Sequence, residues 1–98
     1  MKNFRTLELA VKQYQEIQKL NLKGEMRSQI LRASLSVCLN LSEGNAKLQT
    51  NDRRRFFNIS YASQKEVQTI LMLTEKDKLH DLADSLAAHL YKLQQRTL

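Results

Sequence analysis

The 98-residue sequence contains no proline and only two glycines, Gly24 and Gly44. A proline inside a helix removes a hydrogen bond and costs about 3 kcal/mol, and both residue types mark loops and turns. A chain with so few of them is free to form long helices, interrupted near the two glycines and at short polar segments. At this length it is expected to form one domain, residues 1–98.

Apolar residues recur at spacings of three and four in four segments, residues 3–20, 25–43, 50–74 and 78–95, which is the period of an amphipathic helix. Four such helices of similar length joined by short loops predict an all-α fold, an antiparallel up-down-up-down four-helix bundle. A long coiled coil is the alternative, and the breaks between the segments argue against it. The first apolar stripe consists of Phe4, Leu7, Val11, Tyr14 and Ile17.

The two glycines are expected to act as helix breakers. Gly24 lies between the first two predicted helices and interrupts them. Gly44 directly follows the second apolar stripe, where we expect it to end the helix as a cap in the left-handed backbone region.

Residue types that carry out catalysis or bind metals are sparse. Cys38 is the only cysteine, which excludes an internal disulfide and argues against a structural zinc site. His80 and His89 are nine positions apart, not the four that bring two ligands together on a helix. We therefore expect a protein that is not an enzyme and that takes no metal, cofactor or small-molecule substrate.

The N-terminal residues, MKNFRTLELAV, lack the apolar run of a signal peptide. No stretch of the chain approaches the roughly 20 apolar residues that span a bilayer. Together with the single cysteine, this favours a cytoplasmic protein without a membrane partner.

The net charge is +6 and the calculated isoelectric point is 9.7. Residues 1–49 hold eight basic and four acidic side chains, and residues 50–98 hold eight and six. The excess is spread along the chain and is not gathered in a tail. Charge of this sign favours anionic partners, RNA or DNA first, although it also keeps a protein soluble.

Three consecutive arginines, Arg53, Arg54 and Arg55, open the third predicted helix, and Lys47 lies in the loop before it. Positive charge near a helix N-terminus opposes the helix dipole, which suggests a use beyond helix stability. Arginine binds phosphate through two parallel hydrogen bonds, so these four residues are candidate nucleic-acid contacts. The aromatic residues that follow fit core packing better than stacking on bases; they are Phe56, Phe57 and Tyr61.

A polar row runs along the otherwise apolar second helix at spacings of four, four and three; its members are Arg32, Ser36, Asn40 and Glu43. Each unpaired polar group that is buried costs about 1–3 kcal/mol, so the row needs partners. The third helix offers Ser60, Ser63 and Glu66. We predict an Arg32–Glu66 ion pair bridged by the serine and asparagine side chains. We interpret this network as fixing helix register or a subunit contact, with a ligand site as the alternative.

The segment QILRASLSVCLNLSEG, residues 29–44, resembles the signature Q-I-x-R-A-x-x-S-I-x-x-N-I-A-E-G of proteins encoded in intervening sequences of bacterial 23S rRNA genes. Residues 61–66, YASQKE, are similar to the Ala-x-Ser-x-x-Glu step that follows in this family. The resemblance implies a four-helix bundle that assembles as a ring-like homopentamer. A related fold occurs in basic pentameric accessory proteins of diversity-generating retroelements, which associate with nucleic acid and a reverse transcriptase. The matching positions are Arg32, Ser36, Asn40, Glu43, Gly44, Ser63 and Glu66.

Charge and resemblance together favour a non-enzymatic oligomeric protein that contacts RNA or another nucleic acid through surface lysines and arginines. A ring of identical basic subunits multiplies weak phosphate contacts through avidity. The alternative is a protein–protein assembly scaffold without a nucleic-acid role, whose charge serves solubility or a protein partner.

Overall fold

Four helices make up most of the computed structural model, which describes residues 4–96. They are α1 (Phe4–Gln18), α2 (Gly24–Ala46), α3 (Thr50–Leu73) and α4 (His80–Arg96), and a 3₁₀ turn, η1 (Asp77–Leu79), precedes α4. The described residues contain no β-strand, so the prediction of an all-α protein is confirmed. The predicted start of the first helix, Asn3, lies outside the described residues.

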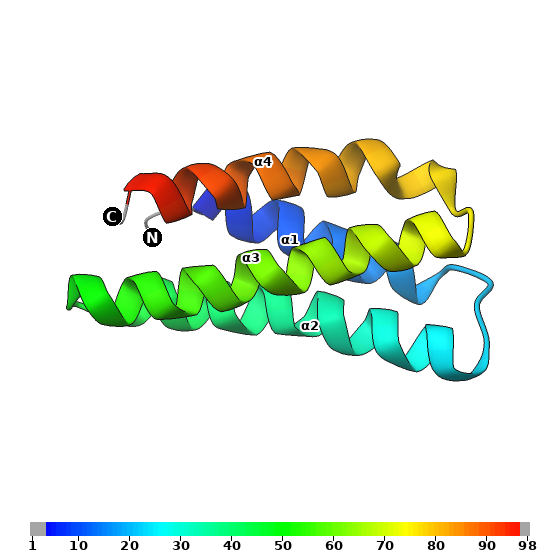
Figure 1. The fold of residues 1–98 in the computed structure, drawn as a ribbon, viewed down its shortest axis with the longest axis horizontal. Helices are drawn as coiled ribbons and strands as arrows, with labels where there is room; N and C mark the ends of the chain where they lie inside the picture. The colour runs from blue at the N-terminus through cyan, green and yellow to red at the C-terminus, as the bar shows by residue number, and fades with distance from the viewer. Residues whose placement is uncertain (1–3, 97–98) are drawn as a thin grey trace.

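The helices lie side by side along the long axis of a body that measures 40 × 22 × 20 Å (Figure 1). The α1–α2 and α3–α4 connections lie at one end. The α2–α3 turn lies at the other end, together with the first residues of α1 and the last residues of α4 (Figure 1). There the turn extends past α1 and α4, because α2 and α3 have 23 and 24 residues whereas α1 and α4 have 15 and 17.

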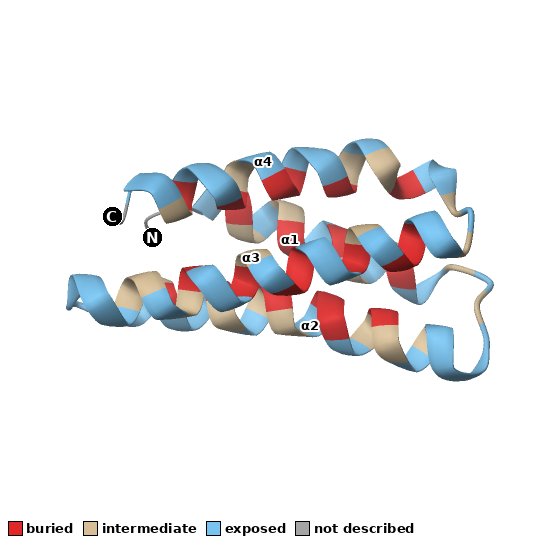
Figure 2. Ribbon diagram, viewed as in Figure 1, coloured by how far each residue is buried: buried red, intermediate tan, exposed pale blue. Residues whose placement is uncertain are grey.

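Buried apolar side chains from all four helices form the core. Figure 2 marks all buried residues, apolar and polar, in red along the ribbon. Removing one large aliphatic or aromatic side chain from water contributes about 1.5–3 kcal/mol, so this shared core holds the helices together. Among the completely or almost completely buried residues are Ile17, Ile30, Val37, Leu41, Phe57, Val67, Leu71, Leu86 and Leu90.

α1 has the predicted helical period, and Ile17 of the predicted stripe is buried, but the buried face is rotated away from other members of that stripe. Phe4 and Val11, expected in the core, are 55% and 41% exposed. Gln13 takes a core position because its side-chain amide is hydrogen-bonded there to Gln64. The buried residues of α1 are Thr6, Ala10, Gln13 and Ile17.

Gly44 does not cap α2, and this prediction is wrong. The helix continues to Ala46, and of the two glycines only Gly24, with φ of +60°, lies in the left-handed region. A Cβ atom at Gly44 would lie 2.5 Å from Cε1 of Phe57, inside van der Waals contact. Gly44 is therefore needed because the Phe57 ring packs against the α2 backbone, and not for its own backbone conformation.

A left-handed residue instead ends α3. Glu75 has φ of +56°, its amide donates to the carbonyl oxygen of Met72 at 3.2 Å, and the amide of Lys76 donates to that of Leu71 at 3.0 Å. This pair of bonds is a Schellman motif, which satisfies the last carbonyl groups of a helix. The motif forms although its left-handed position holds a glutamate, where glycine is the usual residue.

Candidate functional site

The two ends of the molecule differ in charge, although the basic residues are spread along the sequence. We define the basic end as residues 4–8, 43–57 and 91–96, which lie together in Figure 1. It holds seven basic and three acidic side chains, a formal charge of +4. The opposite end, residues 16–27 and 72–84, holds five basic and six acidic side chains, a formal charge of −1. The fold therefore concentrates the positive charge at one end.

The tip of the basic end, residues 43–57, carries all four predicted nucleic-acid contacts. Lys47 follows the last residue of α2, and Arg53, Arg54 and Arg55 lie near the start of α3. Nη1 of Arg53 donates a hydrogen bond of 3.3 Å to the carbonyl oxygen of Lys47. Arg55 is exposed, whereas Arg54 is half-buried and has an interaction partner of its own. Arg53 thus links the start of α3 to the end of α2, and Arg55 projects to the surface.

Two phenylalanine rings lie against these cations. Cζ of Arg53 is 5.4 Å from the centre of the Phe57 ring. Cζ of Arg55 and Nζ of Lys47 are 4.8 and 5.4 Å from the centre of the Phe56 ring. All three distances are within the range of about 6 Å over which a cation is attracted to an aromatic face. Phe57 is buried in the core, so the core interpretation of this residue is confirmed.

The polar row on α2 forms hydrogen bonds with α3. Arg32 pairs with Glu66, as predicted, and also donates to Gln29, so the prediction that serine and asparagine side chains bridge this pair is wrong. The Oγ atoms of Ser36 and Ser63 are 2.8 Å apart, and Nδ2 of Asn40 donates to Oγ of Ser36 at 3.1 Å. The Arg32 and Glu66 side chains are 56% and 48% exposed, so this contact lies at the outer edge of the α2–α3 interface. We call Arg32, Ser36, Asn40, Ser63 and Glu66 the polar ladder.

Two members of the predicted network, Glu43 and Ser60, have partners outside it. Glu43 lies outside the polar ladder, and its carboxylate is 3.6 Å from Nζ of Lys47. Because α2 continues to Ala46, beyond the predicted end, Lys47, four residues after Glu43, lies about one helical turn from it. Ser60 donates to the backbone carbonyl oxygen of Val37 at 2.9 Å and also takes no part in the ladder.

A second polar contact, not expected from the sequence, lies inside the core. Gln13 on α1 and Gln64 on α3 are fully buried and exchange two hydrogen bonds of 2.8 Å each. Nε2 of Gln64 also donates to the carbonyl oxygen of Ala83 on α4 at 3.0 Å. The one signal in the sequence is spacing, because Gln13 lies three residues after Ala10 and four before Ile17. We call Gln13 and Gln64 the amide pair, which joins three helices.

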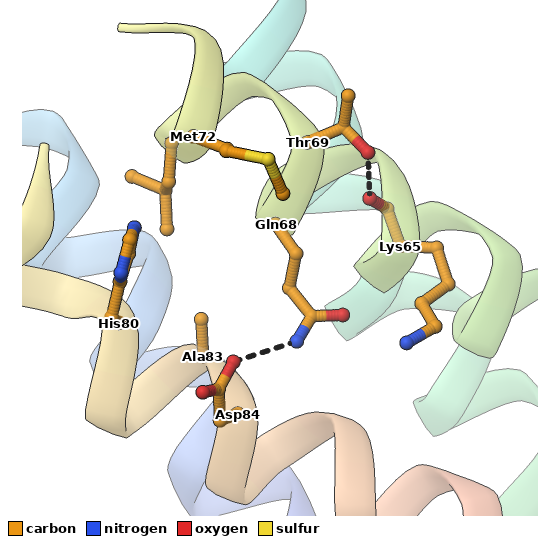
Figure 3. Close-up of a pocket in the computed structure, with 8 residues that line it drawn as sticks. Lys65, Gln68, Thr69, Met72, His80, Ala83 and Asp84 are labelled. Carbon is orange, nitrogen blue, oxygen red and sulfur yellow. Dashed lines mark hydrogen bonds between the residues drawn. The ribbon is translucent and has the colours of Figure 1, made fainter. Parts of the chain in front are cut away.

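Two hollows flank α3. One, of about 480 Å³, lies between α3 and α4, where Nε2 of Gln68 donates to Oδ1 of Asp84 at 2.9 Å (Figure 3). Oε1 of Gln68 is buried and has no hydrogen-bond partner within the described chain. The other hollow, of about 470 Å³, lies beside α2 and borders Glu66 of the polar ladder. Further residues that line the first hollow are Lys65, Thr69, Leu71, Met72, His80 and Ala83.

The cysteine and the two histidines, the residues best suited to nucleophilic catalysis or metal binding, do not form a common site in the described part of the chain. Burial raises the pKa of Cys38 from 9.0 to about 11, so its thiol is protonated at neutral pH and a poor nucleophile. Nδ1 of His89 lies 2.8 Å from the carbonyl oxygen of Ser85, and Nε2 of His80 lies 3.8 Å from Asp77. In the described part of the chain, no three His, Cys, Asp or Glu side chains are placed to hold a metal ion.

None of the helices that the structure describes combines the length and the apolar character needed to cross a lipid bilayer.

A family model described as 23S rRNA-intervening sequence protein matches residues 3–96. This range is almost the whole chain and includes the polar ladder, the amide pair and the tip. No curated protein and no solved structure matches the chain.

Proposed function

Because the chain belongs to the 23S rRNA-intervening sequence protein family, we propose that it is a non-enzymatic, oligomeric binding protein whose tip contacts RNA or another nucleic acid. The observation that carries this proposal is the charge contrast between the two ends, +4 at the basic end and −1 at the other. Neutralising phosphates with lysine and arginine supplies most of the affinity in non-specific nucleic-acid binding. A surface that concentrates such residues is suited to this task.

In this proposal the four helices form an antiparallel up-down-up-down bundle. The placement of the connections in Figure 1 supports this topology. The α1–α2 and α3–α4 connections lie at one end of the molecule, and the α2–α3 turn lies at the other end together with the ends of the described chain. This topology explains how basic residues far apart in the sequence come together at the basic end.

Exposed apolar side chains support self-association. Phe4 and Val11 are seven residues apart on one face of α1, and Leu35 and Leu39 are four apart on one face of α2. Soluble monomers seldom leave large apolar patches open to water. We propose that these side chains are covered between subunits of the homopentamer that the family resemblance implies. Several tips would then contact one polyanion, and avidity would strengthen the binding.

A binding role without catalysis is supported by the state of Cys38, the residue that would be the strongest nucleophile in the chain if ionised. Its pKa is raised to about 11 by burial, so it is not activated. A single half-buried cysteine also suits a reducing compartment, and we place the protein in the cytoplasm.

The test is a filter-binding titration of labelled RNA over a series of salt concentrations. Replacing Arg53, Arg54 and Arg55 by alanine is expected to weaken binding and to flatten the dependence on salt, because fewer counterions are released. The matched control replaces three lysines of the opposite end by alanine, which removes the same charge and is expected to leave binding nearly unchanged; these are Lys19, Lys23 and Lys76.

Equal losses in the two triple variants would contradict the placement of the site at the tip. If the wild-type protein shows no salt-dependent binding but light scattering detects a stable oligomer, the exposed apolar faces favour the alternative function. The protein would then be a protein–protein assembly scaffold without a nucleic-acid role.

A further inference from the structure

The aromatic rings at the tip are already engaged by the protein itself. Phe57 is 1% exposed and packs against Gly44. The half-buried Phe56 ring has the Lys47 ammonium and the Arg55 guanidinium within 5.4 and 4.8 Å of its centre. Proteins that bind single-stranded RNA usually stack its bases on aromatic faces. The tip therefore presents cations to a ligand and does not present an aromatic platform.

The cations of the tip are partly held in place in the free protein. Arg53 is tethered by its hydrogen bond of 3.3 Å to the Lys47 carbonyl oxygen and by the Phe57 ring, and Arg55 lies on Phe56. Ordering a long side chain on binding costs conformational entropy, and a side chain that is already restrained loses less. Restrained guanidinium groups suit a ligand whose phosphates are also fixed in space, as they are in a double helix.

The width of the tip also favours a double-helical ligand. An α-helix with its side chains is about 10–12 Å across, so two adjacent helix ends form a blunt surface of about 20 Å. A-form RNA has a narrow, deep major groove that side chains cannot read and a wide, shallow minor groove bordered by phosphates and 2′-hydroxyl groups. We infer that the tip binds the backbone of double-stranded RNA across its minor groove, without reading the sequence. This inference rests on the proposed function and narrows it to one class of nucleic acid.

The inference is tested by fluorescence anisotropy with three labelled probes of one sequence: an RNA duplex of about 20 base pairs, one of its strands chosen to be unstructured, and the DNA duplex. The RNA duplex is expected to bind at least about tenfold more tightly than the single strand, because its phosphates are denser and release more counterions. The DNA duplex, with a minor groove only about 6 Å wide, is expected to bind more weakly than the RNA duplex.

Two single substitutions locate the contact. Arg55→Ala is expected to weaken binding of the RNA duplex and to lower the salt slope by about one, as expected for one lost phosphate contact. Lys12→Ala removes the same charge from an exposed position in the middle of α1 and is expected to leave duplex binding unchanged. Circular dichroism of each variant verifies that the helices are intact.

Each other result has a defined meaning. Single-stranded RNA that binds as tightly as the duplex, or binding that is lost in Tyr91→Leu, which removes an exposed aromatic ring from α4, would overturn the inference and leave the proposed function standing. DNA and RNA duplexes that bind equally would overturn the minor-groove contact. Failure of all three probes to bind would overturn the inference together with the proposed function.

Discussion

The amide pair and the polar ladder are both polar contacts of α3, yet they lie in opposite surroundings. Gln13 and Gln64 are fully buried and hydrogen-bond to each other, and Gln64 also bonds to α4. Arg32 and Glu66 are about half exposed at the edge of the α2–α3 interface. Water can replace a lost partner of the Arg32–Glu66 pair, but it has no access to the amide pair.

This difference in access to water determines how much each contact matters for stability. A buried amide left without its partner costs about 1–3 kcal/mol, whereas an exposed ion pair contributes about 0.2–1 kcal/mol. Access to water also explains which of these polar groups carry a charge, because removing ions from water costs far more free energy than removing neutral amides. The protein places uncharged glutamines inside and keeps its arginine and glutamate at the surface.

The largest effect is expected from breaking the amide pair. Gln64→Leu leaves both polar atoms of the buried Gln13 side chain unpaired, and it is expected to lower the free energy of unfolding by about 3 kcal/mol. Urea denaturation followed by circular dichroism measures the change. The double variant Gln13→Leu with Gln64→Leu leaves no orphaned amide and is expected to be more stable than Gln64→Leu alone. Losses that simply add would show that the two side chains are not coupled.

The substitution Gly44→Ala measures how tightly apolar groups are packed in the same interior, for comparison with the buried amide pair. Alanine is favoured over glycine in a helix by about 1 kcal/mol, so helix propensity alone predicts stabilisation. The 2.5 Å approach of the Phe57 ring predicts the opposite sign, a loss of about 1–3 kcal/mol from overpacking. The control repeats the substitution in a Phe57→Leu background, where the loss is expected to shrink. A stabilised Gly44→Ala variant would contradict the close packing of Phe57 on α2.

A smaller effect is expected at the polar ladder. Glu66→Gln removes the ion pair with Arg32 and is expected to cost about 0.5 kcal/mol at low salt and less in about 1 M NaCl, where exposed charges are screened. Glu8→Gln on α1 makes the same charge change at an exposed position and serves as the control. A loss above about 2 kcal/mol would mean that the ladder behaves like a buried contact, and the comparison would fail.

The smallest effect concerns Cys38, on the flank of α2 away from the ladder, about 200° around the helix from Ser36. The thiolate is the reactive form, and burial raises the thiol pKa from 9.0 to about 11, so the native protein holds less thiolate at any pH below that value. Labelling with a disulfide reagent is expected to be slow near neutral pH and to accelerate up to about pH 11. The urea-unfolded chain is the control. Equal rates for native and unfolded protein at about pH 8 would contradict the raised pKa.

Several features of the fold and the site were predictable because they depend on residues near one another in the sequence. The absence of proline and the recurring apolar residues predict four helices, and the structure contains them within a few residues of the expected ranges. The Arg32–Glu66 pair was predictable because a polar row stands out on an apolar helix. The amide pair was not, since glutamine is an ordinary residue on exposed helix faces and only its partners make it a core residue.

By itself, the sequence determined that the chain is helical and which residues form the polar row of α2, because both follow from local backbone geometry and from spacing along one helix. Only the tertiary structure decided which face of α1 is buried, why Gly44 carries no side chain, and how basic residues from three segments gather at one end. These features depend on which distant segments lie side by side. Periodicity gives the pitch of a buried face, but the partner helices set its rotation.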